Sequence, residues 1–372
     1  MAGIVPPYRA VFYWEQGGIA LDNPRVNPYA GLLARALAPY GVALEPGWTL
    51  DPTWVREQHG RVQALHLNWL HRFYAHPDPA ERRRRFRQFA TGLLLARRLG
   101  YRLVWTMHNL YPHEPHDPLL DRRARRLMCA LAHAVIAHCH RAAALLAEHF
   151  GRRHDVFVIP HGHFVDVYPN TISRAAARRA LDLPDTAYTY LFFGNIRAYK
   201  GVERLLEVFA GLPDQDLRLV IAGRLHPSYG GPLGSPAAPA PLHDPRIQCH
   251  FGEVPVEQVQ VYFNAADAVV LPFVETLTSG SAITALGFGR PIVVPAVGCL
   301  PELVAGQPCG VVYDPSDADG LRRALAAVRL IDGATATAAA RARALSLDWD
   351  AIARRTLRAY GLVDTGQGER PC

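Results

Sequence analysis

The sequence predicts an α/β protein with two domains, each built around a parallel sheet, and three observations carry this prediction. Short apolar runs alternate with amphipathic helical stretches along the chain, a spacing typical of βα units and parallel sheets. The apolar runs are nearly continuous, as expected of parallel strands that are buried on both faces. The chain has 372 residues, which fits two domains of roughly 150–200 residues better than a single core.

The first half of the chain alternates candidate strands with helical stretches such as "YAGLLARALAPYG" and "DRRARRLMCALAH". Sequential strands separated by such helices are expected to pair in parallel. The candidate strands are residues 10–14, 62–69, 101–108, 134–139 and 155–162.

The second half repeats the pattern, with candidate strands at residues 188–194, 217–223, 246–252, 268–273, 291–295 and 310–313. Between the two sets lies the polar stretch 168–189, which has no strand signal and contains Pro169 and Pro184. We predict the domain junction there, with a first domain over 1–170 and a second over 185–345. The Pro- and Gly-rich stretch 226–245 is predicted to be a mobile loop of the second domain.

The composition excludes several classes of protein. Hydrophobic residues make up 49% and charged residues 20% of the chain, as in globular proteins. No apolar run reaches the roughly 20 residues that span a bilayer, and the N-terminal residues lack the layout of a signal peptide. We therefore expect a cytoplasmic protein. The six cysteines are scattered, which favours reduced thiols over disulfides or a zinc site.

The net charge of +7 is concentrated in the first half. Twelve arginines lie between Arg82 and Arg126, against three carboxylates. The cluster is either a solvated surface or a patch for anionic lipid headgroups or an anionic acceptor, with the inner face of a membrane as the candidate partner. We expect no nucleic-acid partner, because no nucleic-acid module is recognisable.

The stretch "GNIRAYKG", residues 194–201, contains Lys200, the only lysine in a chain with 39 arginines. The following "VERLLEVF" places apolar residues at helical spacing, so Arg197 and Lys200 lie between a strand and a helix. Ligands of open α/β sheets bind at that end of the strands. Two cations beside a helix N-terminus suit a phosphate or diphosphate.

A second turn follows the predicted strand 268–273. Its Thr278, Ser279, Gly280 and Ser281 precede a predicted helix, whose first N–H groups could bind oxygen-rich charge together with the hydroxyls. Glu275 would repel a phosphate but accepts hydrogen bonds from sugar hydroxyls. The alternative is a loop carboxylate paired with an arginine.

In the first half His108 ends a predicted strand and could donate to a phosphate or sugar oxygen, act as a base, or be structural. Other strand ends of this half would line the same edge of the sheet. The histidine clusters at 137–141 and 161–163 match no metal-ligand pattern, so we expect neither a metal nor another cofactor. The residues expected at the edge are Glu15, Gly17, Gly18, His66, Asn68, Trp69 and His108.

Taken together these segments resemble GT-B glycosyltransferases, and most closely the family-4-like enzymes of bacterial polysaccharide and glycolipid synthesis. The resemblance rests on "GNIRAYKGVERLLEVF", "LRLVIAG", "HFGEVPVEQVQVYFNAADAVVLPF", "SGSAITALGFGRPIVVPAVGCLPELV", "GVVYDP" and "LDWDAIARRTLRAY". It implies two Rossmann-like domains, an acceptor side in the first and a nucleotide-sugar side in the second. It also implies that the closing helix, within 346–362, packs back on the first domain.

The resemblance assigns roles to particular residues. Arg197 and Lys200 resemble the basic pair that holds the donor diphosphate. Glu275 resembles the first glutamate of the motif that contacts the donor sugar, and the second glutamate, which binds the ribose, is replaced by Thr284. His108 resembles the histidine near the reacting centre. Gly17 and Gly18 resemble the glycine loop near the donor phosphates.

The implied activity is transfer of a hexose from a GDP- or UDP-sugar to a hydroxyl acceptor, either lipid-linked or a polysaccharide intermediate, without a required metal. His108, Glu275 and Lys200 would be the catalytic group. A sugar-nucleotide epimerase of the same fold and an inactive nucleotide-sugar-binding protein are the alternatives. A dinucleotide oxidoreductase is disfavoured, because no GxGxxG motif follows a strand and opens a helix.

Overall fold

The computed structural model describes residues 7–14, 20–22, 27–112, 117–233 and 240–362. The chain forms two compact units, one of residues 1–162 and 348–372 and the other of residues 163–347. The chain therefore passes from the first unit to the second after Gly162. This point lies before the stretch 168–189, which was expected to join the domains. That stretch belongs to the second unit, and the closing segment belongs to the first.

The first unit contains a parallel sheet with the strand order β2-β1-β3-β4-β5-β6 in the described residues. Its strands are β1 (Tyr8–Tyr13), β2 (Val42–Pro46), β3 (Ala64–Leu67), β4 (Arg102–Met107), β5 (Ala134–Ala137) and β6 (Val156–Val158). Its helices are α1 (Tyr29–Leu37), α2 (Pro52–Glu57), α3 (Pro79–Arg98), α4 (Pro118–Leu131), α5 (His140–Phe150) and α13 (Trp349–Ala359), with short 3₁₀ turns at Ala38–Tyr40 and Leu70–Phe73.

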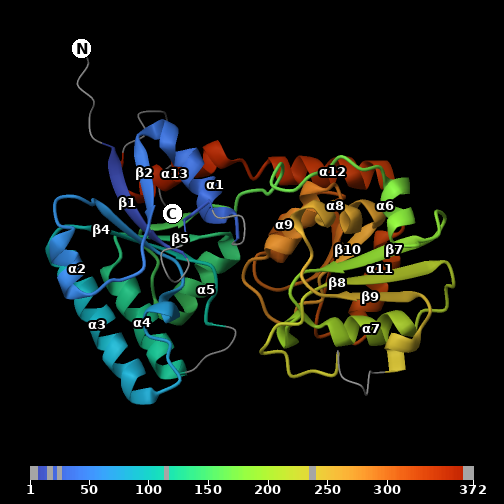
Figure 1. Cartoon of the computed structure of the whole chain (residues 1–372), viewed down its shortest axis with the longest axis horizontal. Coiled ribbons are helices and arrows are strands. Elements are labelled where there is room, and N and C mark those ends of the chain that lie inside the picture. The colour runs from blue at the N-terminus through green and yellow to red at the C-terminus, as the bar shows by residue number, and fades with distance from the viewer. Residues whose placement is uncertain (1–6, 15–19, 23–26, 113–116, 234–239, 363–372) are drawn as a thin grey trace, which may run out of the picture. The chain divides into compact units, whose positions relative to one another are not determined.

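Helices cover both faces of this sheet. In Figure 1, α1 and α13 lie on one side of the strands and α3 and α4 on the other. Alternate residues of β1, such as Ala10 and Phe12, pack in one apolar cluster with residues of α1 and α13. The Asp348 carboxylate caps α13 by accepting from the Ala351 N–H, which fixes where this helix begins.

The second unit contains a parallel sheet with the order β12-β11-β10-β7-β8-β9 in the described residues. Its strands are β7 (Tyr188–Phe193), β8 (Leu217–Gly223), β9 (Ile247–Phe251), β10 (Ala268–Val270), β11 (Ile292–Pro295) and β12 (Gly310–Tyr313). Its helices are α6 (Arg174–Ala180), α7 (Val202–Ala210), α8 (Val256–Ala265), α9 (Gly280–Gly287), α10 (Leu300–Val304), α11 (Gly320–Val328) and α12 (Gly333–Leu345), with 3₁₀ turns at Ala198–Lys200 and Ala240–His243.

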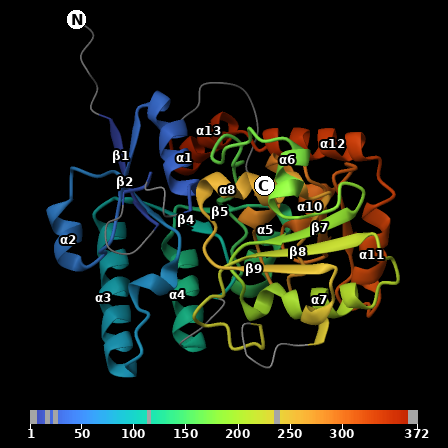
Figure 2. The same ribbon diagram turned by 45° about the vertical axis from the view of Figure 1, so that its right-hand side comes forward.

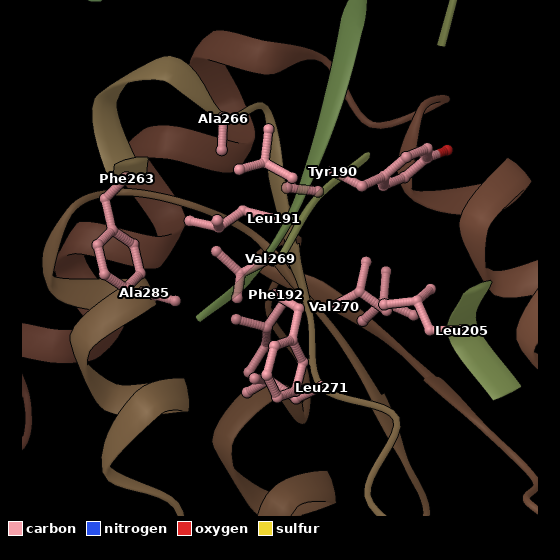
Figure 3. Close-up of a cluster of buried hydrophobic side chains, with 14 of the residues drawn as sticks. Tyr190, Leu191, Phe192, Leu205, Phe263, Ala266, Val269, Val270, Leu271 and Ala285 are labelled. Carbon is pink, nitrogen blue, oxygen red and sulfur yellow. The ribbon is translucent and has the colours of Figure 1, made fainter. Parts of the chain in front are cut away.

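The central strands of the second sheet are apolar on both faces because helices cover both. Figure 2 shows α7 below β9, and α6 and α8 above the strands. In Figure 3, Leu191 and Val269 point toward Phe263, while Val270 points toward Leu205 of α7. All five of these side chains are at most 1% exposed.

The structure confirms the predicted fold class of two parallel α/β sheets. Each predicted strand corresponds to an observed one, but β2 was not predicted. Its sequence, "VALEP", is short and ends in Pro46, and it lies at the edge of the sheet beside β1. A proline is tolerated at such an edge because the missing N–H is not needed by a further strand.

Candidate functional site

The loops that follow β7 and β10 meet at the carboxyl edge of the second sheet. The Val274 N–H donates to the Tyr199 carbonyl at 2.8 Å. Gly201 has a φ of 65°, and a Cβ there would lie 2.2 Å from the Pro272 carbonyl oxygen. A glycine permits both the backbone conformation and this close approach. The turn that carries Lys200 is thus held against the loop after β10.

Lys200, Gly194 and Ser281 surround one small space. A Cβ on Gly194 would lie 3.3 Å from Lys200 Nζ and 3.1 Å from Ser281 Oγ. Gly194 has a φ of 131°, so its backbone conformation favours glycine, and the space for a Cβ there is tight. Because Ser281 lies in the first turn of α9, an ammonium, a hydroxyl and a helix N-terminus converge, which is a set that suits a phosphate group.

The charge of Lys200 is sensitive to its surroundings. Burial, and then the positive charge of Arg197, lower the pKa of Lys200 to about 8. Its Nζ lies 5.3 Å from the centre of the Phe273 ring. An anion bound beside the ammonium would raise the pKa again, because an opposite charge favours the protonated form.

Arg197 is close enough to act on Lys200, but its guanidinium also has a protein partner. Arg197 Nη2 donates to His226 Nε2 at 2.6 Å, and His226 Nδ1 lies 2.7 Å from Ser228 Oγ. The sequence analysis did not identify His226. The sequence feature that could have identified it is its position three residues after the predicted strand 217–223, because residues that follow parallel strands lie together at one edge of the sheet.

The hydroxyls of the turn before α9 have different roles. Ser279 Oγ accepts from the Ala282 N–H at 3.2 Å and is the N-cap of α9. Thr276 Oγ1 donates to the Thr278 carbonyl and shapes the turn. Ser281 is the hydroxyl that reaches the space beside Gly194. Glu275 is exposed in the same loop.

Thr284 lies in another environment. Its hydroxyl donates to the Gly280 carbonyl at 2.9 Å, within α9. Its side chain lines a cavity of about 230 Å³ together with Phe164, Asp166 and Arg341. The structure therefore does not group Thr284 with Gly194 and Lys200, and its predicted contact with a ribose stays a prediction.

In the first unit, His108 follows β4 at the carboxyl edge of the sheet and is 3% exposed. His108 Nε2 lies 2.9 Å from Asn68 Oδ1, and His108 Nδ1 lies 3.1 Å from His138 Nε2. The Trp69 ring stacks on His108 with the centroids 4.8 Å apart. Burial, followed by the neighbouring His138 and other histidines, holds the pKa of His108 well below its usual value.

Three of the strand-end residues predicted for this edge are thus brought together: Asn68, Trp69 and His108. His66 is buried with them in the sheet, where its ring nitrogens contact the hydroxyls of Tyr360 and Thr106 at 2.8 and 2.7 Å. His138 was not singled out as a candidate, although it lies near the end of the predicted strand 134–139 and directly follows the observed β5. Glu15, Gly17 and Gly18 lie outside the described residues.

The arginine cluster is partly structural. Arg82 and Arg125 are buried, and they donate to backbone carbonyls such as those of His76 and Asp121. Glu81 pairs with Arg84 and Arg85 on the surface of α3. The exposed arginines of α3 and α4 are Arg83, Arg84, Arg87, Arg97, Arg98, Arg122, Arg123 and Arg126.

The described residues offer neither a metal site of side chains nor a membrane-spanning helix. They contain no group of three or more histidine, cysteine, aspartate or glutamate side chains placed to hold a metal ion. They also contain no helix that is long and apolar enough to cross a membrane.

Known protein families match both units. The model for glycosyl transferases group 1 matches residues 173–330, and that for glycosyltransferase family 4 matches residues 57–167. A D-inositol 3-phosphate glycosyltransferase from Xylanimonas cellulosilytica is 30% identical over 292 residues, which are 72% of this chain and 68% of that protein. A GDP-mannose:glycolipid 4-beta-D-mannosyltransferase from Xanthomonas campestris is 29% identical over 282 residues, 73% of this chain and 71% of that protein.

Solved structures support the fold. A sucrose-phosphate synthase from Thermosynechococcus elongatus aligns with a TM-score of 0.73 and 19% identity, covering 96% of this chain and 98% of that one. The Anabaena protein HepE, in complex with UDP and glucose, aligns with a TM-score of 0.69 and 17% identity over 96% of this chain and all of that one.

The two parallel sheets and these matches define the chain as a glycosyltransferase with the GT-B fold. More particularly, the chain belongs to the family-4-type glycosyltransferases, the family that its sequence was found to resemble.

Proposed function

We propose that this glycosyltransferase moves a hexose from a nucleoside diphosphate sugar, with GDP or UDP as the nucleotide, to a hydroxyl acceptor that is lipid-linked or part of a growing polysaccharide. The observation that carries the proposal is the convergence of Lys200, Ser281 and the α9 N-terminus on the space beside Gly194. Such a group of donors suits the diphosphate of the sugar donor.

The relatives support this choice of substrates. The Xanthomonas relative is named for GDP-mannose and a glycolipid, and the Anabaena structure contains UDP and glucose. Both names describe a nucleotide sugar or its parts. We propose the same donor class for this chain and a glycolipid or polysaccharide as the acceptor class.

In the proposed reaction the acceptor hydroxyl oxygen forms a bond to the anomeric carbon of the sugar and releases its proton to a base or to solvent, while the bond between the sugar and the diphosphate breaks and negative charge grows on the departing diphosphate. The Lys200 ammonium and the first N–H groups of α9 would stabilise that charge, and prearranged donors of this kind make large contributions to catalysis. Glu275, exposed in the adjoining loop, would accept from hydroxyls of the donor sugar. We assign no metal to this step, and the first unit would receive the acceptor.

The test measures nucleotide binding and sugar transfer separately. A thermal-shift panel of UDP-, GDP- and ADP-sugars should show stabilisation by one nucleotide class, because a ligand of the native state raises apparent stability. Lys200→Ala should weaken that shift and reduce transfer by about 100-fold or more, as removal of a charge-stabilising donor does elsewhere. Arg218→Ala is a matched control, since Arg218 lies at the opposite end of β8 and donates to the Gln215 carbonyl.

Several outcomes would contradict the proposal. Unchanged binding in Lys200→Ala would exclude the phosphate role of this residue. An isomerised sugar formed without acceptor would identify an epimerase. Tight nucleotide binding with neither transfer nor hydrolysis, over a panel of lipid-linked and oligosaccharide acceptors, would identify a binding protein.

We also propose that the exposed arginines of α3 and α4 hold the enzyme at an anionic membrane surface. Each basic residue near such a surface contributes about 1 kcal/mol of attraction, and salt weakens it. Sedimentation with phosphatidylglycerol vesicles should therefore exceed that with phosphatidylcholine vesicles and fall in high salt. Replacing Arg122, Arg123 and Arg126 by glutamine should reduce it, and equal sedimentation of variant and parent would show a merely solvated surface.

A further inference from the structure

A chain of four hydrogen-bond contacts runs across the carboxyl edge of the first sheet. It links one residue at or directly after the carboxyl end of each of five neighbouring strands, in the order in which β1, β3, β4, β5 and β6 lie in the sheet. From the β1 end to the β6 end, its members are the carbonyl of Tyr13, the side chains of Asn68, His108 and His138, and the carbonyl of Ile159.

The two ends of this chain can only accept hydrogen bonds. The Tyr13 carbonyl accepts from Asn68 Nδ2 at 3.2 Å. The Ile159 carbonyl lies 2.9 Å from His138 Nδ1, which must therefore carry a proton. With Nδ2 of Asn68 directed at Tyr13, its Oδ1 faces His108 Nε2 at 2.9 Å, and that nitrogen must also carry a proton.

Counting donors shows that the chain lacks one proton. A neutral imidazole supplies one N–H, and the Asn68 amide supplies one N–H to the chain, so three donors serve four contacts. The deficit falls between His108 Nδ1 and His138 Nε2, two nitrogens that lie 3.1 Å apart. Turning the Asn68 amide around would only move the deficit to the Tyr13 carbonyl, because the number of donors would not change.

We propose that His108 and His138 act as one proton-binding pair, which takes up a single proton shared between His108 Nδ1 and His138 Nε2. His138 is thereby a positioning residue: it fixes the tautomer and the orientation of His108 and determines when His108 becomes part of a cation.

The groups around the pair have opposing effects on this proton uptake. The stacked Trp69 ring favours a cationic pair. Burial opposes the charge and lowers the pKa of His138 to about 4, and the N-terminus of α5, which begins two residues after His138, also disfavours a cation. Among the described residues, titratable groups that face the pair include His66 from β3, Tyr29 from α1 and His161 after β6.

His66 shows that burial alone does not create a missing donor like that between His108 and His138. It is fully buried in the same sheet, but both of its partners, Tyr360 and Thr106, are hydroxyls. A hydroxyl can donate or accept, so neutral His66 satisfies both contacts without an extra proton. Burial also lowers the pKa of His66, to about 3. It is thus an internal reference for a buried histidine without a donor deficit.

The proposal is tested on the complete protein with ¹⁵N-labelled histidine side chains, whose nitrogen shifts report tautomer and charge. At neutral pH, His108 should carry its proton on Nε2 and His138 on Nδ1. On acidification both rings should shift with one common midpoint and take up one proton in total, while His66 stays neutral. Two independent midpoints, two protons, or the opposite tautomer of either ring would overturn the proposal, and the parent protein alone decides these outcomes.

Two variants connect the pair to the reaction and assign the signals. In His138→Gln, an amide N–H can donate to His108 Nδ1 without proton uptake, so the His108 titration should disappear. We expect kcat of the parent to fall as the pH drops below neutrality, and His138→Gln should lose this fall, beyond any uniform loss of activity. His161→Gln, a replacement at a buried neighbour outside the chain of contacts, should retain the shared titration and the fall in kcat. Identical pH profiles for the parent and His138→Gln would refute a positioning role.

Discussion

At the scale of single residues, Lys200 is the cation of the proposed donor site whose charge depends on pH near neutrality. Its pKa of about 8 lies below the ordinary lysine value because of burial and of Arg197. The ammonium is therefore present below about pH 8 and is lost as the pH rises through that value. We expect the affinity for UDP or GDP, whichever binds, to fall as the pH is raised from about 7 to about 9.

Lys200→Arg is the matched control for this prediction, because a guanidinium stays charged throughout that range. Calorimetric titrations at several pH values should show affinity that falls with pH in the parent and stays level in Lys200→Arg. A parent affinity that is independent of pH would mean that Lys200 is already fully charged or does not contact the nucleotide.

Sequence reasoning at this scale found residues but not their groupings. Lys200 was conspicuous as the one lysine in the chain. Its position between a predicted strand and a predicted helix placed it at the carboxyl edge of the sheet. The approach of Ser281 Oγ and Lys200 Nζ to Gly194 depends on how two loops far apart in sequence pack. His226 and His138 were missed because a histidine after a strand has no signature until its partners are known.

At the scale of elements, the turn from β7 to α7 depends on Gly201. Alanine there would meet the Pro272 carbonyl at 2.2 Å and would also adopt an unfavourable φ of 65°. We expect Gly201→Ala to destabilise the second unit by about 2–4 kcal/mol, combining backbone strain with a steric clash. Nucleotide binding should fall as well, because the turn that carries Lys200 would be displaced from the loop of β10.

Gly306→Ala separates the two causes. Gly306 belongs to the same unit and has a φ of 70°, but a Cβ there would meet nothing within 4 Å. This variant should lose only the roughly 1–2 kcal/mol of backbone strain and should bind nucleotide normally. Denaturant titrations of both variants measure the difference, and equal losses would show that the contact with Pro272 relaxes without cost.

The elements themselves could be predicted where burial dictates the pattern. Central strands such as β7 and β8 are apolar on both faces, so their sequences stand out. The edge strand β2 was not predicted, because its residues are only partly buried after Val42. Helix α6 was not predicted within the polar stretch 168–189, because its buried Arg178 donates hydrogen bonds to carbonyls of neighbouring loops in place of an apolar contact.

At the scale of the whole molecule, the two units differ in their content of tryptophans, which report unfolding by fluorescence, and of histidines with lowered pKa values. All six tryptophans lie in the first unit, so tryptophan fluorescence follows the unfolding of that unit. The same unit contains a group of buried or partly buried histidines whose pKa values are lowered, chiefly by burial. Its members are His66 and His161, with values of about 3, His133 and His138, with values of about 4, and His108.

These histidines make the first unit sensitive to acid. Each has a lower pKa in the folded state than in the unfolded chain, where it is near 6.5, so the unfolded chain binds protons first as the pH falls. Their neutral burial is without penalty above about pH 6.5, and stability is lost progressively below it. The midpoint of thermal unfolding seen by tryptophan fluorescence should therefore drop between about pH 7.5 and about pH 5.5, by about 2–4 °C for each kcal/mol lost. Far-UV circular dichroism, which senses both units, should show that the second unit is less affected, since most of the shifted histidines lie outside it. A fluorescence midpoint that stays constant over this range would mean that the buried histidines accept protons without unfolding, and the donor deficit at His108 and His138 provides one place where a single proton could enter.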